Sequence, residues 1–144
     1  MLFSLGNRPT KVSVVTNHMI TEAFLAVMDC NVIVVDWQRL AGQGCNTAAR
    51  GVPDLGNHLG SFIWVDSLLL TGFSLGAYVV CNAGRQIGGR ARRETGLDSA
   101  GPTCGGNSQA LNRNCGRYVE GIHTDGRTRG FMNLIAHADF YPNG

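Results

Sequence analysis

The amino-acid sequence predicts an α/β domain, with a mostly parallel sheet that carries helices on both faces. Three observations predict it. The chain of 144 residues is long enough for one domain with its own core. Segments rich in β-branched residues alternate with segments whose apolar residues recur at helical spacing. The run Val32–Val35 is entirely β-branched, which is typical of a strand buried in a parallel sheet.

Each element is predicted from its local pattern. Apolar or β-branched runs predict strands at Lys11–Val15, Asn31–Trp37 and Ser67–Thr71, and Arg93–Leu97 and Tyr118–His123 are two further candidate strands. Helix formers or helical spacing predict helices at Ile20–Met28, Asp54–Trp64 and Leu75–Arg85, the first of them capped by Thr21. Because parallel α/β sheets place functional residues at the carboxyl ends of their strands, those ends are where chemistry is expected.

Composition excludes several classes of partner. The hydrophobic fraction of 44% and the charged fraction of 15% are those of a globular domain. A formal net charge of +2 is too small to indicate nucleic acid or an anionic membrane as a partner. Arginines gather between Arg85 and Arg93, where a solvated loop is favoured over a phosphate-binding patch. No apolar run is long enough to span a bilayer, and the first residues do not read as a signal peptide.

The five cysteines give an odd count, with no CxxC pair and no zinc spacing. Cys30 and Cys81 lie in apolar stretches and are expected to be buried thiols. Cys104 and Cys115 share a segment rich in glycine and asparagine, so a disulfide between them is one of the pairings that the sequence leaves open. These residues predict no metal site, and no cofactor is predicted.

The segment Gly72–Gly76 reads Gly-Phe-Ser-Leu-Gly and matches the G-x-S-x-G pattern of α/β-hydrolases. A strand is predicted before it and a helix of small residues after it, which is the context that the pattern requires. A nucleophilic serine must stand on a sharp strand-to-helix turn, where side chains at the two glycine positions would collide with neighbouring elements. We therefore predict Ser74 as the nucleophile. The backbone N–H of Leu75 is the predicted oxyanion-hole donor, assisted by the helix dipole.

Asp98 is the candidate acid of the same site. It follows the predicted strand Arg93–Leu97, one strand–helix–strand unit after Ser74, so the two strand ends are expected to be neighbours. In α/β-hydrolases the chain order is serine, acid, histidine, and the acid orients the imidazole. The alternative is that Asp98 is an ordinary loop aspartate that caps the turn after it.

The sequence does not identify the general base. His18 and His58 precede Ser74, against the expected order, while His123 and His137 are of a kind that more often serves in a polar core. Without a general base, a serine hydroxyl is a poor nucleophile at neutral pH. The sequence therefore predicts a nucleophile and an acid without the histidine that should join them.

Four longer segments extend the pattern, namely GFSLGAYVVCNAGRQIGGR, TGLDSAGP, YVEGIHTD and HADFYPNG. Together they resemble the pancreatic-lipase-like family, and most of all its insect midgut branch, from about Arg8 to Gly144. The resemblance implies an α/β-hydrolase fold, an extracellular location, and action at a lipid–water interface. It implies hydrolysis of triacylglycerols, phospholipids or galactolipids without a cofactor. It also implies that Ser74 and Asp98 are the nucleophile and the acid, and that the Leu75 amide forms half of the oxyanion hole.

The chain departs from this family in several places. Val15–Met19 stands where the family has a His-Gly-aromatic motif that completes the oxyanion hole, and Ser99 stands where it has a proline. Asn112 and Cys115 occupy positions of calcium-binding carboxylates, so no calcium is expected. The family's catalytic histidine lies beyond the HADFYPNG segment. Residues 1–144 are therefore expected to be part of a lipase catalytic domain that lacks the signal region, the lid, the histidine region and the C-terminus.

Three functions compete. The first is a secreted serine carboxylic ester hydrolase of lipid catabolism, either a triacylglycerol lipase or a phospholipase A1, whose activity this chain by itself is expected to lack. The second is an inactive lipid-binding or yolk-like protein, although such relatives usually lose the serine that this chain keeps. The third is a gene fragment with no function of its own, which the departures favour. The substrate class and the oligomeric state are left open by the sequence.

Overall fold

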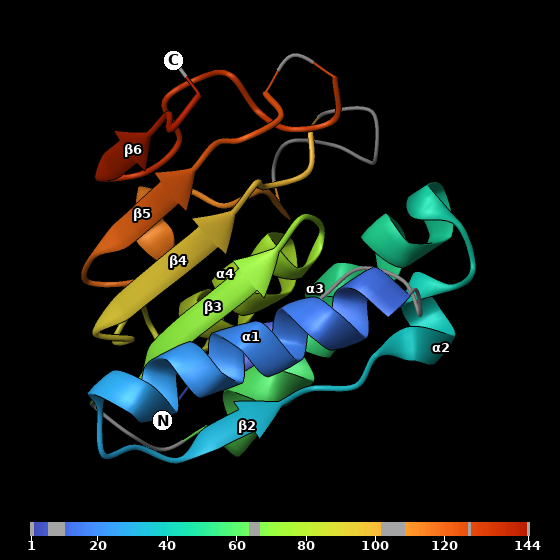
Figure 1. Ribbon diagram of the computed structural model, residues 1–144. Helices are drawn as coiled ribbons and strands as arrows, with labels where there is room; N and C mark the ends of the chain where they lie inside the picture. Colours follow the sequence, from blue (N-terminus) through green and yellow to red (C-terminus); the bar gives the residue numbers. More distant parts are fainter. Residues whose placement is uncertain (1, 6–10, 64–66, 102–108, 127, 144) are drawn as a thin grey trace.

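The computed structural model describes residues 2–5, 11–63, 67–101, 109–126 and 128–143 (Figure 1). Within them, the strands form one parallel sheet in the order β2-β1-β3-β4-β5-β6. The strands are β1 (Leu2–Leu5), β2 (Val32–Val34), β3 (Leu69–Phe73), β4 (Arg93–Leu97), β5 (Val119–Ile122) and β6 (Ala138–Phe140). The predicted parallel sheet is confirmed.

Helices lie on both faces of this sheet. They are α1 (Lys11–Val27), α2 (Gln38–Ala41), α3 (Cys45–Phe62), α4 (Gly76–Gln86) and the short 3₁₀ helix η3 (Arg113–Cys115). In Figure 1, α1 lies on one face, and α3 and α4 lie on the other. Helix α4 packs against β3 and β4, and α3 packs against α4. The two-faced arrangement therefore agrees with the sequence prediction.

Small residues let α3 and α4 come close together. A Cβ added at Gly56 of α3 would lie 2.4 Å from the Cβ of Asn82, and one at Gly60 would lie 2.8 Å from the carbonyl oxygen of Ala83. The residues of α4 from Gly76 to Gly84 are all buried. Because α4 is enclosed by α3 and the sheet, the turn that enters it after β3 is held in one position.

The predicted strand at Lys11–Val15 is wrong, because these residues form the N-terminal end of helix α1. A short valine-rich run fits either a strand or a buried stretch of helix, and length has to decide between them. The strand that takes its place beside β3 is β1, which the sequence analysis missed. Thr21 is therefore inside α1 and not its cap, and its Oγ1 donates to the carbonyl oxygen of Asn17 at 2.8 Å.

Other boundaries shift for local reasons. Helix α3 begins at Cys45, before the predicted start at Asp54, and it contains Pro53, a residue that is unfavourable inside a helix. It ends at Phe62, and Trp64 lies outside the described residues. The strand predicted at Asn31–Trp37 shortens to β2 at the sheet edge. There Val34 is 45% exposed, so the expected full burial is wrong.

Four further elements agree closely with the prediction. The predicted strand at Arg93–Leu97 is β4, and the helix predicted at Leu75–Arg85 is α4 displaced by one residue. The strand expected at Ser67–Thr71 is β3, which begins and ends two residues later. The strand expected at Tyr118–His123 is β5 without its two end residues. Strand β6 was not predicted. None of the described helices is long and apolar enough to cross a membrane.

The cysteine predictions need correction. Cys81 and Cys115 form a disulfide, so the pairing of Cys104 with Cys115, which the sequence left open, does not form, and the expected buried free thiol at Cys81 is wrong. Cys104 itself lies outside the described residues. Cys30 is a free thiol but only half-buried. The pairing follows from tertiary contact, because η3 packs against α4 and brings the two Cα atoms to 4.8 Å.

Candidate active site

Ser74 occupies the corner between β3 and α4. Its φ of 54° lies in the left-handed region, which residues other than glycine rarely adopt. Residues with such strained backbones cluster at active sites and ligand-binding sites. Its N–H donates to the carbonyl oxygen of Leu97 at 2.9 Å, which continues the ladder between β3 and β4. Its own carbonyl oxygen accepts from the N–H of Ala77 at 3.1 Å. One residue thus closes the strand and opens the helix.

The glycine at position 72 allows this corner to form. A Cβ there would lie 2.3 Å from the carbonyl oxygen of Gly76 and 2.6 Å from the nitrogen of Ala77. Any side chain would therefore force the end of β3 away from the start of α4. The steric reason that the sequence analysis gave for Gly72 agrees with these distances.

Leu75 is the residue immediately before α4, and its side chain is fully buried. The first N–H groups of a helix have no partner within the helix, and they point toward its N-terminal end. The amide predicted as an oxyanion-hole donor therefore belongs to the group of amides at this helix start, next to Ser74. The helix dipole adds a partial positive charge at the same end.

Asp98 follows β4 in the same way that Ser74 follows β3. Its φ is 49°, also left-handed. Its Oδ1 accepts from the backbone N–H groups of Thr124 at 3.0 Å and Asp125 at 2.9 Å, in the loop after β5. The carboxylate is thus held by the loop after β5, and neither donor lies in the turn that directly follows Asp98. The role of Asp98 as the acid stays a prediction.

The sheet register puts these two residues side by side. Phe73 pairs with Leu97, so Ser74 and Asp98 are the first residues past the ends of adjacent parallel strands. Tyr78 of α4 secures the same region, because its hydroxyl donates to the carbonyl oxygen of Ala100 at 2.5 Å. Burial raises the pKa of Tyr78 to about 12, so the phenol keeps its proton at neutral pH. The helix that begins at Ser74 is thereby tied to the segment that follows Asp98.

The four histidines all have other partners. His18 on α1 lies 3.1 Å from Glu22, and the Nδ1 of His58 on α3 lies 2.7 Å from the carbonyl oxygen of Asp54; both histidines are exposed. The Nδ1 of His137 accepts from the backbone N–H of Val119. In the part of the chain that the structure describes, no histidine bonds to the proposed nucleophile or acid.

His123 is buried beside the proposed acid. Its Nε2 lies 2.8 Å from Oδ1 of Asp139, its ring stacks on Tyr141, and it lines a cavity of about 340 Å³ together with Thr124 and Asp125. Asp139 also accepts from the backbone N–H groups of residues 135 and 136. The sequence analysis expected a polar core role for His123 but missed Asp139. Asp139 lies on β6, which was not predicted, so its contact with His123 left no local signal in the sequence.

The segments that depart from the family pattern have definite structures. Val15–Met19 is helical within α1, so it forms no loop at a strand end beside Ser74. The Oδ1 of Asn112 accepts from the N–H of Asn114 and caps η3, while Cys115 is in the disulfide. Neither residue offers a carboxylate to a cation.

Comparison with known proteins gives the family. Residues 8–144 match the family model described as "Lipase". Lipase member H-A of Xenopus laevis is 38% identical over 150 residues, which cover 96% of this chain and 33% of that protein. Lipase member H of Mus musculus is 32% identical over 154 residues, with the same coverage. Hepatic triacylglycerol lipase of Rattus norvegicus is 37% identical over 132 residues, which cover 79% of this chain and 27% of that protein.

The chain therefore spans about a third of the length of these relatives. The family match extends over almost all of it, including the corner at Ser74, the neighbouring Asp98 and the parallel sheet that carries both. The family also implies that the sheet is that of an α/β-hydrolase. The resemblance found in the sequence is confirmed, and the chain belongs to the lipase family.

Proposed function

We propose that this chain forms the nucleophile-bearing part of a secreted serine carboxylic ester hydrolase that acts on lipid esters. The observation that carries the proposal is the left-handed corner at Ser74, next to a carboxylate whose direction is fixed from the adjacent strand connection. Sharp strand-to-helix corners of this kind present a hydroxyl at the edge of the sheet. The names of the relatives agree with the reaction class.

In the proposed reaction, Oγ of Ser74 attacks the carbonyl carbon of the ester while its proton passes to an imidazole. The developing oxyanion accepts a hydrogen bond from the N–H of Leu75, and one such donor is typically worth about 3 kcal/mol in the transition state. The alcohol leaves with the proton that the imidazole returns. Water then attacks the acyl group on Ser74, through the same base, and releases the fatty acid.

Asp98 is the residue proposed to orient that imidazole. Its Oδ1 is occupied by two backbone amides, whereas Oδ2 has no hydrogen-bond partner among the described residues. A carboxylate held through one oxygen can accept the imidazole Nδ1–H with the other. The four histidines of this chain have other partners. We therefore expect the base to come from a region of the longer relatives that has no counterpart in these 144 residues.

The substrate class and the location are finer parts of the proposal. One relative is named a triacylglycerol lipase, and we propose triacylglycerol as the substrate class, with phospholipid cleaved at one acyl position as the alternative. The disulfide between Cys81 and Cys115 supports an extracellular location, since disulfides persist mainly in oxidising compartments.

A fluorophosphonate probe tests the nucleophile directly. The chain is incubated with the probe and increasing free imidazole, and adducts are located by peptide mass spectrometry. We expect labelling of Ser74 that rises with imidazole, because the added base replaces the one that is missing from the site. The variant Ser74→Ala should lose this labelling. The variant Ser61→Ala, which removes an exposed serine hydroxyl on α3, should retain it.

The same experiment separates the hydrolase from the second candidate, an inactive lipid-binding protein. That candidate is favoured by the absence of a histidine bonded to Ser74 in the described part of the chain. A folded chain that stays unlabelled at saturating imidazole, yet binds a fluorescent fatty-acid ester, would support it and would contradict the hydrolase proposal. Loss of the imidazole-dependent labelling in Asp98→Asn would instead support the proposed acid.

A further inference from the structure

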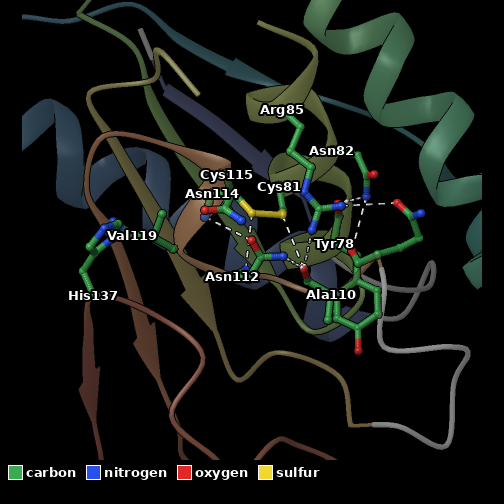
Figure 2. The surroundings of a disulfide bond; sticks show 11 residues. Tyr78, Cys81, Asn82, Arg85, Ala110, Asn112, Asn114, Cys115, Val119 and His137 are labelled. Atoms are coloured by element: carbon green, nitrogen blue, oxygen red, sulfur yellow. Dashed lines mark hydrogen bonds between the residues drawn. A yellow bond between two sulfur atoms is a disulfide. The ribbon is translucent and has the colours of Figure 1, made fainter. Parts of the chain in front are cut away.

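A second cluster of reactive side chains lies behind the sheet, away from Ser74. It consists of Cys81 on α4, Glu94 on β4 and Cys115 at the end of η3, and we call it the Glu94 cluster. All three residues are fully buried, and one ligand atom from each lies within 4.8 Å of the others. Figure 2 shows the disulfide between its two cysteines, with Arg85 and the segment around Asn112 next to it.

The carboxyl group of Glu94 is the unusual member of this cluster. Neither of its oxygens has a hydrogen-bond partner in the described structure, although the residue is 0% exposed. Its Oε1 lies against Gly84 of α4, where an added Cβ would come within 1.7 Å. Buried polar groups almost always have a hydrogen-bond partner. A buried carboxyl group without one therefore points to a bound ligand, or to a different chemical form of the residues next to it.

The neighbouring disulfide provides that second state. Two cysteine sulfurs and a carboxylate from three different elements form a donor set suited to Zn²⁺, which binds thiolate and carboxylate in tetrahedral sites. We propose that reduction of the Cys81–Cys115 disulfide converts the Glu94 cluster into a binding site for a divalent cation of the zinc class. The ligands are the two thiolates and the Glu94 carboxylate, with water as the fourth. No sequence spacing indicates this site, because the residues meet only in the folded chain.

The chemistry balances in two steps. Two equivalents of a thiol give two electrons and two protons to the disulfide and become a disulfide themselves, which leaves Cys81 and Cys115 as thiols. Binding of the cation then releases one proton from each thiol and one from the Glu94 carboxyl group. The oxidised and the metal-bound forms exclude each other, because the same sulfur atoms serve either the S–S bond or the cation.

The charge of Arg85 favours the metal-bound form. Two thiolates, one carboxylate and a divalent cation leave a net charge of −1 in a buried position. The guanidinium of Arg85 is half-buried, acts electrostatically on Glu94, and donates to the carbonyl oxygen of Ala110 at 3.1 Å. The fixed positive charge of Arg85 offsets part of the excess negative charge without being a ligand.

The segment that contacts the two buried sulfur atoms also lines a cavity. A cavity of about 520 Å³ is lined by residues 110–114 together with Leu134 and Ile135. The same segment contacts both sulfurs, since the N–H of Asn112 donates to Sγ of Cys115 at 3.3 Å, and Sγ of Cys81 lies 3.4 Å from the carbonyl oxygen of Ala110. A reductant or a cation that enters through this cavity therefore has to pass this segment to reach the sulfur atoms.

Titration with Co²⁺, a spectroscopic substitute for Zn²⁺, tests the proposal. The full chain is reduced with a phosphine, which takes oxygen from water and forms no thiolate complex, and the reductant is removed without air. We expect a thiolate-to-cobalt charge-transfer band that saturates at one Co²⁺ per chain in the reduced protein, and no such band in the oxidised protein. The variant Glu94→Gln keeps both thiols and the side-chain size, and it should bind Co²⁺ at least about tenfold more weakly.

The cysteine variants serve as specificity controls. Cys81→Ser should abolish the band, whereas Cys30→Ser, which removes the half-buried free thiol, should leave it unchanged. Circular dichroism reports the fold in parallel. If reduction unfolds the chain, recovery of helical signal on adding Co²⁺ would support the site, because metal binding and folding are then coupled. Binding that Cys81→Ser or Glu94→Gln leaves intact, or a reduced chain that binds no Co²⁺, would overturn the proposal.

Discussion

Ser74 and Asp98 leave adjacent parallel strands at the same level, and both leave with a left-handed backbone, at φ values of 54° and 49°. Two such residues next to each other are uncommon, because each conformation is costly for a side chain with a Cβ. The cost is met by rigid surroundings. Helix α4 is buried along most of its length, and the loop after β5 donates two hydrogen bonds to Asp98.

Gly72→Ala should disrupt the corner at Ser74. The new Cβ would lie 2.3 Å from the carbonyl oxygen of Gly76, so either β3 or α4 has to move. We expect a loss of about 3 kcal/mol or more in the free energy of unfolding, measured by urea denaturation. Gly88→Ala is the matched control, since its φ is +70° but nothing lies within 4 Å of the added Cβ. It should cost only about 1–2 kcal/mol, from backbone strain. Equal losses in both variants would contradict the steric argument.

Asp98→Asn should leave the free energy of unfolding nearly unchanged, whereas Asp98→Ala should lower it. Asparagine keeps an oxygen that can accept from the N–H groups of Thr124 and Asp125, so the free energy of unfolding should change by less than about 1 kcal/mol. Alanine leaves both amides without that acceptor and should cost about 1–3 kcal/mol. Thermal unfolding of the two variants checks this difference. If both lose the same stability, Oδ1 does not hold the loop.

The positions of Ser74 and Asp98 just after neighbouring strands were predictable because their signals are local. Two glycines lie within five positions around Ser74, an apolar strand precedes Ser74, and a predicted strand ends directly before Asp98. The strand predicted at Lys11–Val15 failed because five apolar-rich residues fit a helix equally well, and the competing strand β1 decides the matter only in the folded sheet.

The disulfide and the buried pair of His123 with Asp139 were not predictable in this way. Cys81 and Cys115 are separated by 34 positions, and only the packing of η3 on α4 brings them together. Asp139 receives hydrogen bonds from two backbone amides and faces the ring of His123, which directly follows another strand. Contacts that depend on strand order and helix packing leave no pattern in nearby residues.

Asp139→Ala should be among the most damaging substitutions of a polar side chain. It removes the partner of a buried histidine and the acceptor of two backbone N–H groups, and both side chains of the pair are at most 3% exposed. We expect a loss of about 3 kcal/mol or more in the free energy of unfolding. Asp29→Ala, at an exposed position after α1, should stay within about 0.5 kcal/mol of the parent. Comparable urea midpoints for the two variants would show that the pair contributes little.

Glu94 should make the oxidised protein less stable as the pH rises. Desolvation by burial raises the pKa of its carboxyl group well above the ordinary value of 4.5, and the positive charge of Arg85 opposes this shift only in part. Above pH 4.5 the unfolded chain releases this proton while the folded chain keeps it. The folded state then binds more protons, so stability falls with rising pH until the folded-state pKa is passed, and levels off above it.

The variant Glu94→Gln isolates this effect, because its side chain has nearly the same shape but cannot ionise. With the disulfide intact and a chelator present, urea denaturation at a series of pH values gives the stability difference between variant and parent. We expect similar stability near pH 4.5. At pH 8 we expect Glu94→Gln to be more stable by at least about 1 kcal/mol, because the folded parent must either retain the proton on Glu94 or bury a charged carboxylate. Glu94→Leu, which removes the polar atoms as well, should show the same trend with pH. A difference that does not change with pH would mean that the carboxyl group of Glu94 finds a partner or water in solution.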